Sequence, residues 1–282
     1  MSLAGKTLFV SGASRGIGLE IALRAARDGA NVALIAKTAE PHPKLEGTVY
    51  TAAEQIEAAG GSALPIVGDI RDEAQVAEAV GQAVERFGGI DICVNNASAI
   101  NLSGTEALEM KRYDLMQDIN VRGTFAVSRA CIPHLRKGEN PHVLTLSPPI
   151  DLDPKWLGPH IGYTLAKYGM SLVALGLAAE LREDGVASNT LWPRTLVATA
   201  AVQNLLGGDA AMERARKPAI YADAAYAILN RPARECSGNA FLCEDVLLEE
   251  GVTDLSAYSF VPGAELAVDL FVDAADPPAA TG

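Results

Sequence analysis

Short apolar runs alternate with longer amphipathic stretches along most of this chain. An apolar run of about five residues is typical of a strand buried in a parallel sheet, and apolar positions that recur every three or four residues are typical of a helix. The runs predict strands at residues 6–10, 31–36, 63–67, 91–95, 142–147, 186–192 and 239–243. Helical spacing occurs at residues 19–26, 50–59, 72–87, 111–136, 160–183 and 220–229. This alternation predicts an α/β fold of the Rossmann type, a doubly wound parallel sheet of about seven strands with helices on both faces.

No linker and no internal repeat divides the chain. We expect one domain over residues 1–250, since 49% apolar residues are enough for a large core. Residues 251–282 are expected to form a C-terminal extension. Its tip, DAADPPAATG, is acidic and rich in proline and alanine, which is typical of a flexible chain end.

The composition narrows the class of protein. A formal net charge of −12 argues against binding to nucleic acid or to an anionic membrane surface, because both need clustered lysine and arginine. No apolar run reaches the length of a membrane span. The four cysteines lack CxxC or metal-ligand spacing, so we expect buried reduced thiols and no metal site. The N-terminal MSLAGKTLFV has no signal-peptide core, which favours a cytoplasmic location.

A glycine-rich turn, SGASRGIG at residues 11–18, directly follows the first predicted strand and opens the first helix. Gly12 permits a tight turn, Gly16 lets backbone N–H groups approach a pyrophosphate, and Gly18 allows the helix to pack closely. The turn therefore predicts a dinucleotide site. The residues expected to bind the cofactor here are Gly12, Ser14, Arg15, Gly16, Ile17 and Gly18.

The end of the second predicted strand bears on which dinucleotide binds. An NAD site usually has an acidic residue there, whereas this chain has Lys37 after Ala36. Arg15 of the glycine turn could reach the same pocket. Two cations and no carboxylate favour a 2′-phosphate, so we expect NADP(H) rather than NAD(H). The alternative is that Lys37 is simply solvated.

Polar turns also follow the third and fourth predicted strands. Asp69, with Ile70 beside it, could accept a hydrogen bond from the adenine amino group. Asn96 could border the adenine ribose. As isolated features, such residues are more often turn formers.

Tyr163 and Lys167 are four residues apart in a predicted helix, so their side chains lie on one face. An ammonium near a phenol favours the phenolate, which makes the tyrosine a usable proton donor and acceptor near neutral pH. This pairing suits carbonyl and alcohol redox chemistry. Taken alone, it is also common on exposed helix faces.

The joint pattern resembles the short-chain dehydrogenase/reductase family over residues 5–245. It consists of the glycine turn, Asn95-Asn96-Ala97, Asn120, Ser147 and the Tyr163-Lys167 pair, in this order. Four further segments resemble one subgroup of that family, whose members can carry a C-terminal sterol-carrier domain. They are AKTAEPHPKLEGTVYTAAEQIEAAGG, LSPPIDLDPKW, YTLAKYGMS and LWPRT. We expect no sterol-carrier domain in this chain.

The resemblance implies a catalytic role for four residues. Tyr163 would exchange a proton with the substrate oxygen, and Lys167 would lower the tyrosine pKa and bind the nicotinamide ribose. Ser147 would hydrogen-bond the substrate carbonyl, and Asn120 would hold a water that relays protons. Pro193 and Thr195 would contact the cofactor. The implied activity is interconversion of a carbonyl and a secondary alcohol on an apolar, lipid-like small molecule, with NADP(H) as the cofactor.

Two departures from the usual family pattern and one expected lid bear on the predicted site. Ser147 precedes Tyr163 by 16 residues, a longer spacing than usual, so the loop over residues 148–159 is extended and is expected to shape the substrate mouth. Pro193 is followed by Arg194 instead of glycine, which leaves open whether Thr195 or Thr199 reaches the carboxamide. The stretch LLGG at residues 205–208 is expected to form a mobile lid.

The helix that contains Tyr163 is rich in small residues, which favours a homodimer or homotetramer through this helix and the one with Asn120. A close contact within the chain would give the same composition. Two other functions stay open at this point. One is a nucleotide-binding scaffold or lipid-binding protein with little turnover, and the other is a lyase or epimerase on the same fold.

Overall fold

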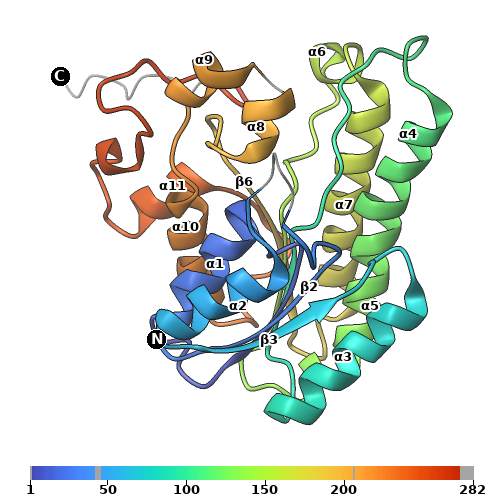
Figure 1. Ribbon diagram of the computed structural model, residues 1–282, viewed down its shortest axis with the longest axis vertical. Helices are drawn as coiled ribbons and strands as arrows, with labels where there is room; N and C mark the ends of the chain where they lie inside the picture. The colour runs from blue at the N-terminus through green and yellow to red at the C-terminus, as the bar shows by residue number, and fades with distance from the viewer. Residues whose placement is uncertain (1, 42–45, 206, 274–282) are drawn as a thin grey trace.

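All seven predicted strands are present and form one parallel sheet in the order β3-β2-β1-β4-β5-β6-β7. The computed structural model describes residues 2–41, 46–205 and 207–273 (Figure 1). The strands are β1 Thr7–Ser11, β2 Asn31–Ala36, β3 Ser62–Val67, β4 Ile92–Asn95, β5 His142–Thr145, β6 Ala187–Trp192 and β7 Ala240–Leu242. The predicted Rossmann-type fold is confirmed.

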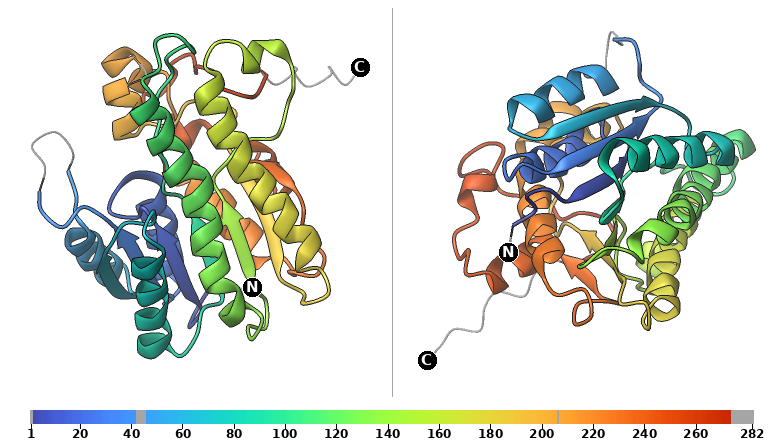
Figure 2. Two further views of the ribbon diagram at one scale, coloured as in Figure 1. Left: turned by 90° about the vertical axis from the view of Figure 1, so that its right-hand side faces the viewer. Right: turned by 90° about the horizontal axis from the view of Figure 1, so that it is seen from below.

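Helices cover both faces of this sheet (Figure 2). Before β5 the chain forms α1 Gly16–Ala26, α2 Val49–Ala58, α3 Glu73–Phe87, α4 Met110–Met116, the π-helix η1 Gln117–Arg122 and α5 Gly123–Leu135. After it come α6 Pro154–Leu157, α7 Ile161–Glu180, α8 Ala200–Leu205, α9 Gly208–Glu213, α10 Ala219–Asn230, α11 Cys243–Glu249 and the 3₁₀-helix η2 Ser256–Tyr258.

Successive strand residues point to opposite faces and build two hydrophobic cores. Leu8 and Val10 of β1 face the core shared with α1, α2 and α10. Phe9, between them, faces the core shared with α3, α5 and α7. Because both faces are covered, the strands read as continuous apolar runs, which is why the sequence revealed them. All four cysteines are buried and free, as predicted.

The predicted helix at residues 111–136 is α4, η1 and α5 in continuous succession, with an unpredicted π-helical segment at its centre. Helix α7 is long and apolar enough to cross a membrane by length and composition alone, contrary to the sequence expectation. However, 61% of its apolar window is buried inside the fold. This burial is typical of a core helix, and it makes α7 weak evidence for a membrane span.

The region expected to form a lid contains the short helices α8 and α9. Leu206, which belongs to that prediction, lies outside the described residues. The C-terminal extension folds back on the body of the protein, and an antiparallel bridge joins Val268 to Thr195. The tip from residue 274 onward also lies outside the described residues.

Candidate active site

The polar segments singled out from the sequence follow different strands but meet at one edge of the sheet. In a parallel sheet the carboxyl ends of all strands lie on the same side. Ligands bind on that side at the point where the strand order reverses, so that the chain continues to one side of the sheet from one strand and to the other side from its neighbour. Strand β1 is that point, because it pairs with β2 on one side and with β4 on the other. The glycine turn leaves β1 there, with Asn96 just after β4.

The glycine turn is held by Asn96. Its Nδ2 donates hydrogen bonds to the carbonyl oxygens of Ser11 (3.0 Å) and Gly12 (2.9 Å). Gly12 has a φ of 72°, a left-handed conformation that favours glycine. A Cβ on Gly18 would lie 2.5 Å from Asn96 Nδ2, so the close contact of Gly18 is with this amide. Asn96 therefore shapes the turn, and its predicted contact with the ribose stays a prediction.

The N-terminus of α1 is open for an anion. Arg15 occupies the N-cap position without a side-chain capping bond. A Cβ on Gly16 would have no neighbour closer than Thr199 Cγ2, at 4.0 Å. Uncapped N–H groups and the helix dipole favour negative charge at this place. The turn around Ser14 and Ile17 thus leaves space beside uncapped N–H groups, and its contact with a pyrophosphate stays a prediction.

Arg15 lies beside the loop that follows β2. Its guanidinium donates to the carbonyl oxygens of Glu46 and Gly47, each at 2.7 Å. Burial lowers the pKa of Arg15 from its usual value. These contacts fix the guanidinium against the backbone of residues 46 and 47.

Lys37 lies next to a carboxylate, which corrects the expectation that none is present. Its Nζ is 3.3 Å from Asp69 Oδ2, and its side chain is 59% exposed. Strands β2 and β3 are neighbours, and Ala36 pairs with Val67. The residues that follow the two strands therefore lie next to each other at the same edge of the sheet.

Asp69 is held by Arg71 as well. Arg71 Nε and Nη2 both donate to the Asp69 carboxylate, at distances between 2.5 and 3.0 Å. These bonds, with Lys37, hold the pKa of Asp69 well below its usual range. Ile70 is buried, and a Cβ on Gly123 would meet its Cδ1 at 2.5 Å, so Ile70 packs against the start of α5. The adenine contacts predicted for Asp69 and Ile70 stay predictions.

The four residues of the predicted catalytic set are almost completely buried. Tyr163 is 5% exposed, Lys167 3%, and Ser147 and Asn120 0%. Lys167 Nζ donates to the carbonyl oxygen of Leu146 at 2.9 Å, which joins α7 to the end of β5 immediately before Ser147. The Ser147 hydroxyl is buried and has no partner among the described residues. An unpaired buried donor is costly unless a ligand satisfies it.

The electrostatics of Tyr163 differ from the expectation. Burial raises its pKa, and the charge of Asp269 raises it further. Burial lowers the pKa of Lys167 to about 7, while Asp269 acts in the opposite direction. The side chains of this chain alone thus do not produce the low tyrosine pKa predicted from the Tyr-Lys spacing, because burial disfavours the charged form of both groups.

Asn120 connects two elements of the site. Its Oδ1 accepts from Ala99 N (2.7 Å), and its Nδ2 donates to Ala99 O (3.0 Å). Asn120 lies in η1, and π-helical segments frequently occur at functional sites. A Cβ on Gly169 of α7 would lie 2.5 Å from Val121 Cγ2, so α7 packs tightly against η1. The Asn120 side chain holds the loop after β4, and its role with a relay water stays a prediction.

The buried carboxylate of Glu244, which the sequence analysis did not single out, holds the segment after β6 in place. Glu244 accepts from Arg194 N (2.8 Å) and from Thr195 Oγ1 (3.2 Å). The Thr195 hydroxyl therefore already has a partner. By contrast, Thr199 Cγ2 is the nearest atom to a Cβ placed on Gly16, at 4.0 Å. Pro193 precedes this segment at the end of β6. The carboxyl-edge position of Pro193 and Thr195 agrees with the predicted cofactor site, and their contacts with a cofactor are untested.

The largest unpredicted feature is an aromatic cluster around Phe271 of the C-terminal extension. Rings of five residues lie within 6.1 Å of the Phe271 ring, measured between centroids. They are Trp156, His160, Tyr163, Tyr168 and Trp192. The only signal in the sequence is a pair of apolar triplets, Leu-Ala-Val at residues 266–268 and Leu-Phe-Val at residues 270–272, on either side of Asp269.

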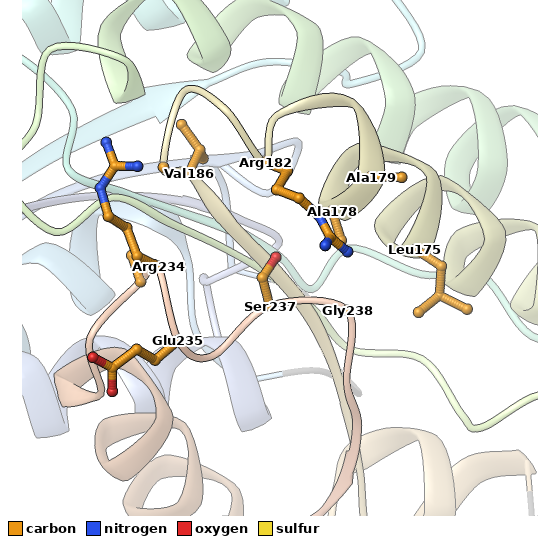
Figure 3. Close-up of a pocket in the computed structure, with 11 residues that line it drawn as sticks. Leu175, Ala178, Ala179, Arg182, Val186, Arg234, Glu235, Ser237 and Gly238 are labelled. Carbon is orange, nitrogen blue, oxygen red and sulfur yellow. The ribbon is translucent and has the colours of Figure 1, made fainter.

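A cavity of about 320 Å³ lies elsewhere, between the C-terminal end of α7, the start of β6 and the loop before β7 (Figure 3). Arg182, Arg234 and Ser237 are among the residues that line it. It is at the amino-terminal edge of β6, opposite the catalytic set. The guanidinium groups of Arg182 and Arg234 point away from each other, so this cavity shows no convergent polar site.

Comparison with known proteins identifies the family. Residues 6–208 match the family model for short chain dehydrogenases. The chain belongs to the short-chain dehydrogenase/reductase family. It is 56% identical over 271 residues to hydroxysteroid dehydrogenase-like protein 2 of Danio rerio, covering 96% of this chain and 65% of that protein. The chain thus spans just under two thirds of that relative. The family and subgroup predicted from the motifs are confirmed.

Solved structures agree with this assignment to the short-chain dehydrogenase/reductase family. A crystal structure of a short chain dehydrogenase from Mycobacterium thermoresistibile is 69% identical, with a TM-score of 0.94 and 100% coverage of both chains. More distant members share the fold. A metagenomic short-chain oxidoreductase in complex with NADP is 23% identical and covers 86% of this chain, with a TM-score of 0.70. A Mycobacterium paratuberculosis member bound to NAD is 21% identical, also at 86% coverage, with a TM-score of 0.72.

Proposed function

We propose that this protein interconverts a carbonyl and a secondary alcohol on an apolar, lipid-like substrate, with NADP(H) as the hydride carrier. The observation that carries the proposal is the unpaired, buried hydroxyl of Ser147. It follows the residue whose carbonyl binds Lys167, at the same sheet edge as the uncapped glycine turn. A substrate oxygen would satisfy this hydroxyl.

The residues present fit a dinucleotide. The turn at Gly12 to Gly18 and the N-terminus of α1 would hold the pyrophosphate, and Lys167 would bind the nicotinamide ribose. When bound, the cofactor supplies or accepts the hydride. Ser147 then donates a hydrogen bond to the substrate oxygen and orients it. Tyr163 gives a proton to that oxygen in reduction and takes it back in oxidation.

The dry surroundings of Tyr163 and Lys167 favour neutral forms, which suits proton transfer between a phenol and a developing alkoxide. A phenol whose pKa is raised stays protonated in the resting site. It is therefore available as an acid for reduction. Lys167, with a pKa of about 7, can exchange protons near neutral pH.

The preference for NADP(H) rests on Arg15 and Lys37. Both lie at the cofactor end of the site, and Arg71 adds a third cation beside Asp69. The cluster of Lys37, Arg71 and Asp69 has one more positive charge than negative charge. A 2′-phosphate would add to that cluster, and Arg15 would face it from the glycine turn.

The test is a screen of ketones, aldehydes, 3-oxoacyl thioesters and secondary alcohols, read by NADP(H) absorbance. The wild-type chain is compared with Tyr163→Phe, which removes only the phenol oxygen. We expect Tyr163→Phe to keep cofactor binding and to lose most turnover. Unchanged turnover in that variant would exclude Tyr163 as the acid. Net change in NADPH separates an oxidoreductase from a lyase, an epimerase or a binding protein with little turnover.

We also propose a cytoplasmic location and a homodimer or homotetramer. Support for the oligomer comes from three large apolar side chains exposed on neighbouring helices. Phe125 of α5 is 55% exposed, and Leu165 and Leu172 of α7 are 49% and 61% exposed. Leu165 and Leu172 are seven residues apart and share one face of α7. Figure 2 shows α5 and α7 side by side on the outside of the molecule.

A further inference from the structure

Two segments meet over the predicted catalytic residues: the extended loop at residues 148–159 and the C-terminal stretch at residues 264–273. The second is fixed by backbone bonds to the chain after β6. Asp269 N donates to Arg194 O, and Leu196 N donates to Ala267 O, each at 2.9 Å. Trp192 Nε1 also donates to Leu270 O at 2.9 Å. The C-terminal stretch is therefore fixed to the carboxyl end of β6, at the edge of the sheet where the predicted catalytic residues lie.

Phe271 is held in an unusual backbone conformation. Its φ is 68°, and no other non-glycine residue in the described part of the chain has a positive φ. A side chain with a Cβ is disfavoured there, and such strain clusters at functional sites. The ring is 2% exposed and lies 6.0 Å from the Tyr163 ring. The backbone thus accepts strain to place an aromatic ring beside the predicted proton donor.

The extended loop closes the other side of this ring. Trp156 of α6 lies 6.1 Å from Phe271. Tyr168 lies 5.3 Å from Phe271, and its hydroxyl donates to Asp151 O at 2.6 Å. Lys155 forms an ion pair with Asp273 at 2.7 Å. The loop and the C-terminal stretch thus hold each other in place around Phe271.

Asp269 adds a carboxyl group at the same place. Its Oδ1 accepts from Leu270 N at 2.7 Å, and no ion pair to it is found within the described ranges. Part of the residue is accessible to solvent, yet its crowded surroundings raise its pKa to about 7, against the effect of Lys167. Its charge acts on both Tyr163 and Lys167. The backbone bond from Asp269 N to Arg194 O holds this residue beside the segment after β6.

We propose that residues 264–272 complete the substrate site, with the Phe271 ring as the wall beside the carbon skeleton of the substrate. This inference rests on the proposed function, because it concerns the substrate of the same site. The substrate class is an uncharged ketone or secondary alcohol with an apolar ring or chain on the reacting carbon.

Tryptophan fluorescence gives a direct binding test. The chain has two tryptophans, Trp156 and Trp192, and both rings lie 6.1 Å from Phe271. Acetophenone and 2-acetylnaphthalene are titrated into the protein, alone and saturated with NADPH, and quenching gives a Kd for each ketone. We expect both ketones to bind the wild type. Absence of quenching by either ketone overturns the inference.

The size preference tests the wall. Phe271→Ala opens space, so the preference for 2-acetylnaphthalene over acetophenone is expected to rise about ten-fold. Phe271→Leu is expected to shift it less, in the same direction, and serves if the alanine variant does not fold. Phe260→Ala is the matched control, because Phe260 is in the same extension and 44% exposed. An unchanged preference in the folded Phe271 variants contradicts the proposal.

The two proposals fail in different ways. If quenching shows the expected preferences but no ketone is reduced, the proposed activity is wrong and the binding wall stands. If ketones are reduced but the Phe271 variants keep the wild-type order of Kd and kcat/KM, the C-terminal stretch does not select the substrate.

Discussion

Lys167 Nζ lies 2.9 Å from the carbonyl oxygen of Leu146 and so ties the helix of the proposed proton donor to the strand that presents Ser147. Replacing Lys167 by methionine removes both the charge and this bond. We expect turnover to fall about 100-fold or more, in the range usual for the loss of acid–base assistance. Lys167→Arg keeps the charge and should retain more activity. Steady-state kinetics of the two variants checks this, and equal loss in both would show that position matters more than charge.

Ser147→Ala should lower turnover without lowering the free energy of unfolding. The hydroxyl is buried without a partner, so its removal is expected to leave the free energy of unfolding unchanged or to raise it. Turnover should fall about 100-fold, as expected for the loss of a donor to the substrate oxygen.

Ser171→Ala is the matched control for that experiment. The Ser171 hydroxyl is also buried but donates to Pro148 O at 2.6 Å. Its loss should cost about 1 kcal/mol of unfolding free energy. Thermal melts and kcat measured on both variants separate the two roles, and a destabilised Ser147→Ala would show that the hydroxyl has a structural partner.

Lys37→Ala should weaken NADPH binding about three- to ten-fold and leave NADH binding nearly unchanged, because only the former carries a 2′-phosphate. Isothermal titration with both cofactors measures the ratio of the two Kd values. Lys137→Ala, an exposed lysine at the C-terminal end of α5, is the control. Tighter binding of NADH than of NADPH to the wild type would contradict the proposed cofactor preference.

The stability of the fold should depend on pH through His142. Burial lowers its pKa from 6.5 to about 4. Its Nε2 lies 3.1 Å from Arg231 O, and its Nδ1 is buried with no partner among the described residues. Between these two pKa values the unfolded chain binds the proton more readily. Stability is therefore complete above pH 6.5 and falls as the pH drops towards 4, by about 3 kcal/mol.

Urea unfolding at several pH values checks this prediction. His142→Gln keeps an amide that can donate to Arg231 O but does not titrate, so its stability should vary less between pH 4 and 6.5. Identical curves for the wild type and the variant would assign the acid sensitivity to other groups.

Leu165→Asp and Leu172→Asp should dissociate the proposed oligomer. Both side chains are exposed on one face of α7, and a carboxylate buried between subunits is strongly unfavourable. Light scattering after size-exclusion chromatography gives the mass. Leu248→Asp, at a leucine of α11 that is 49% exposed, is the control. A monomeric wild type would contradict the proposal.

The fold was predictable because its strands are buried on both faces and therefore read as apolar runs. The edge of the site was predictable for a related reason, since each motif follows a strand and parallel strands end on the same side. Strand order was not available from these runs. From the sequence we therefore predicted separate roles for Lys37 and Asp69. In the fold β2 and β3 are neighbours, and Lys37 Nζ lies 3.3 Å from Asp69 Oδ2.

The C-terminal part of the site could not be predicted in the same way. Residues 264–273 form no long helix or strand, so no periodicity indicates where they lie. A backbone bond from Asp269 to Arg194 and a positive φ at Phe271 fix their positions, and neither leaves a periodic signal in the sequence. Glu244 was missed for a similar reason, because its carboxylate binds backbone and side-chain groups after β6 that only the folded chain brings near.

The path of the C-terminal stretch has a practical consequence for protein engineering. Asp273 forms an ion pair with Lys155 of the extended loop. The N-terminus leads into β1 from the opposite end of the strands (Figure 1). An affinity tag or a fused carrier module is therefore best attached at the N-terminus for assays. A module attached directly after Asp273 would instead be tethered beside the extended loop.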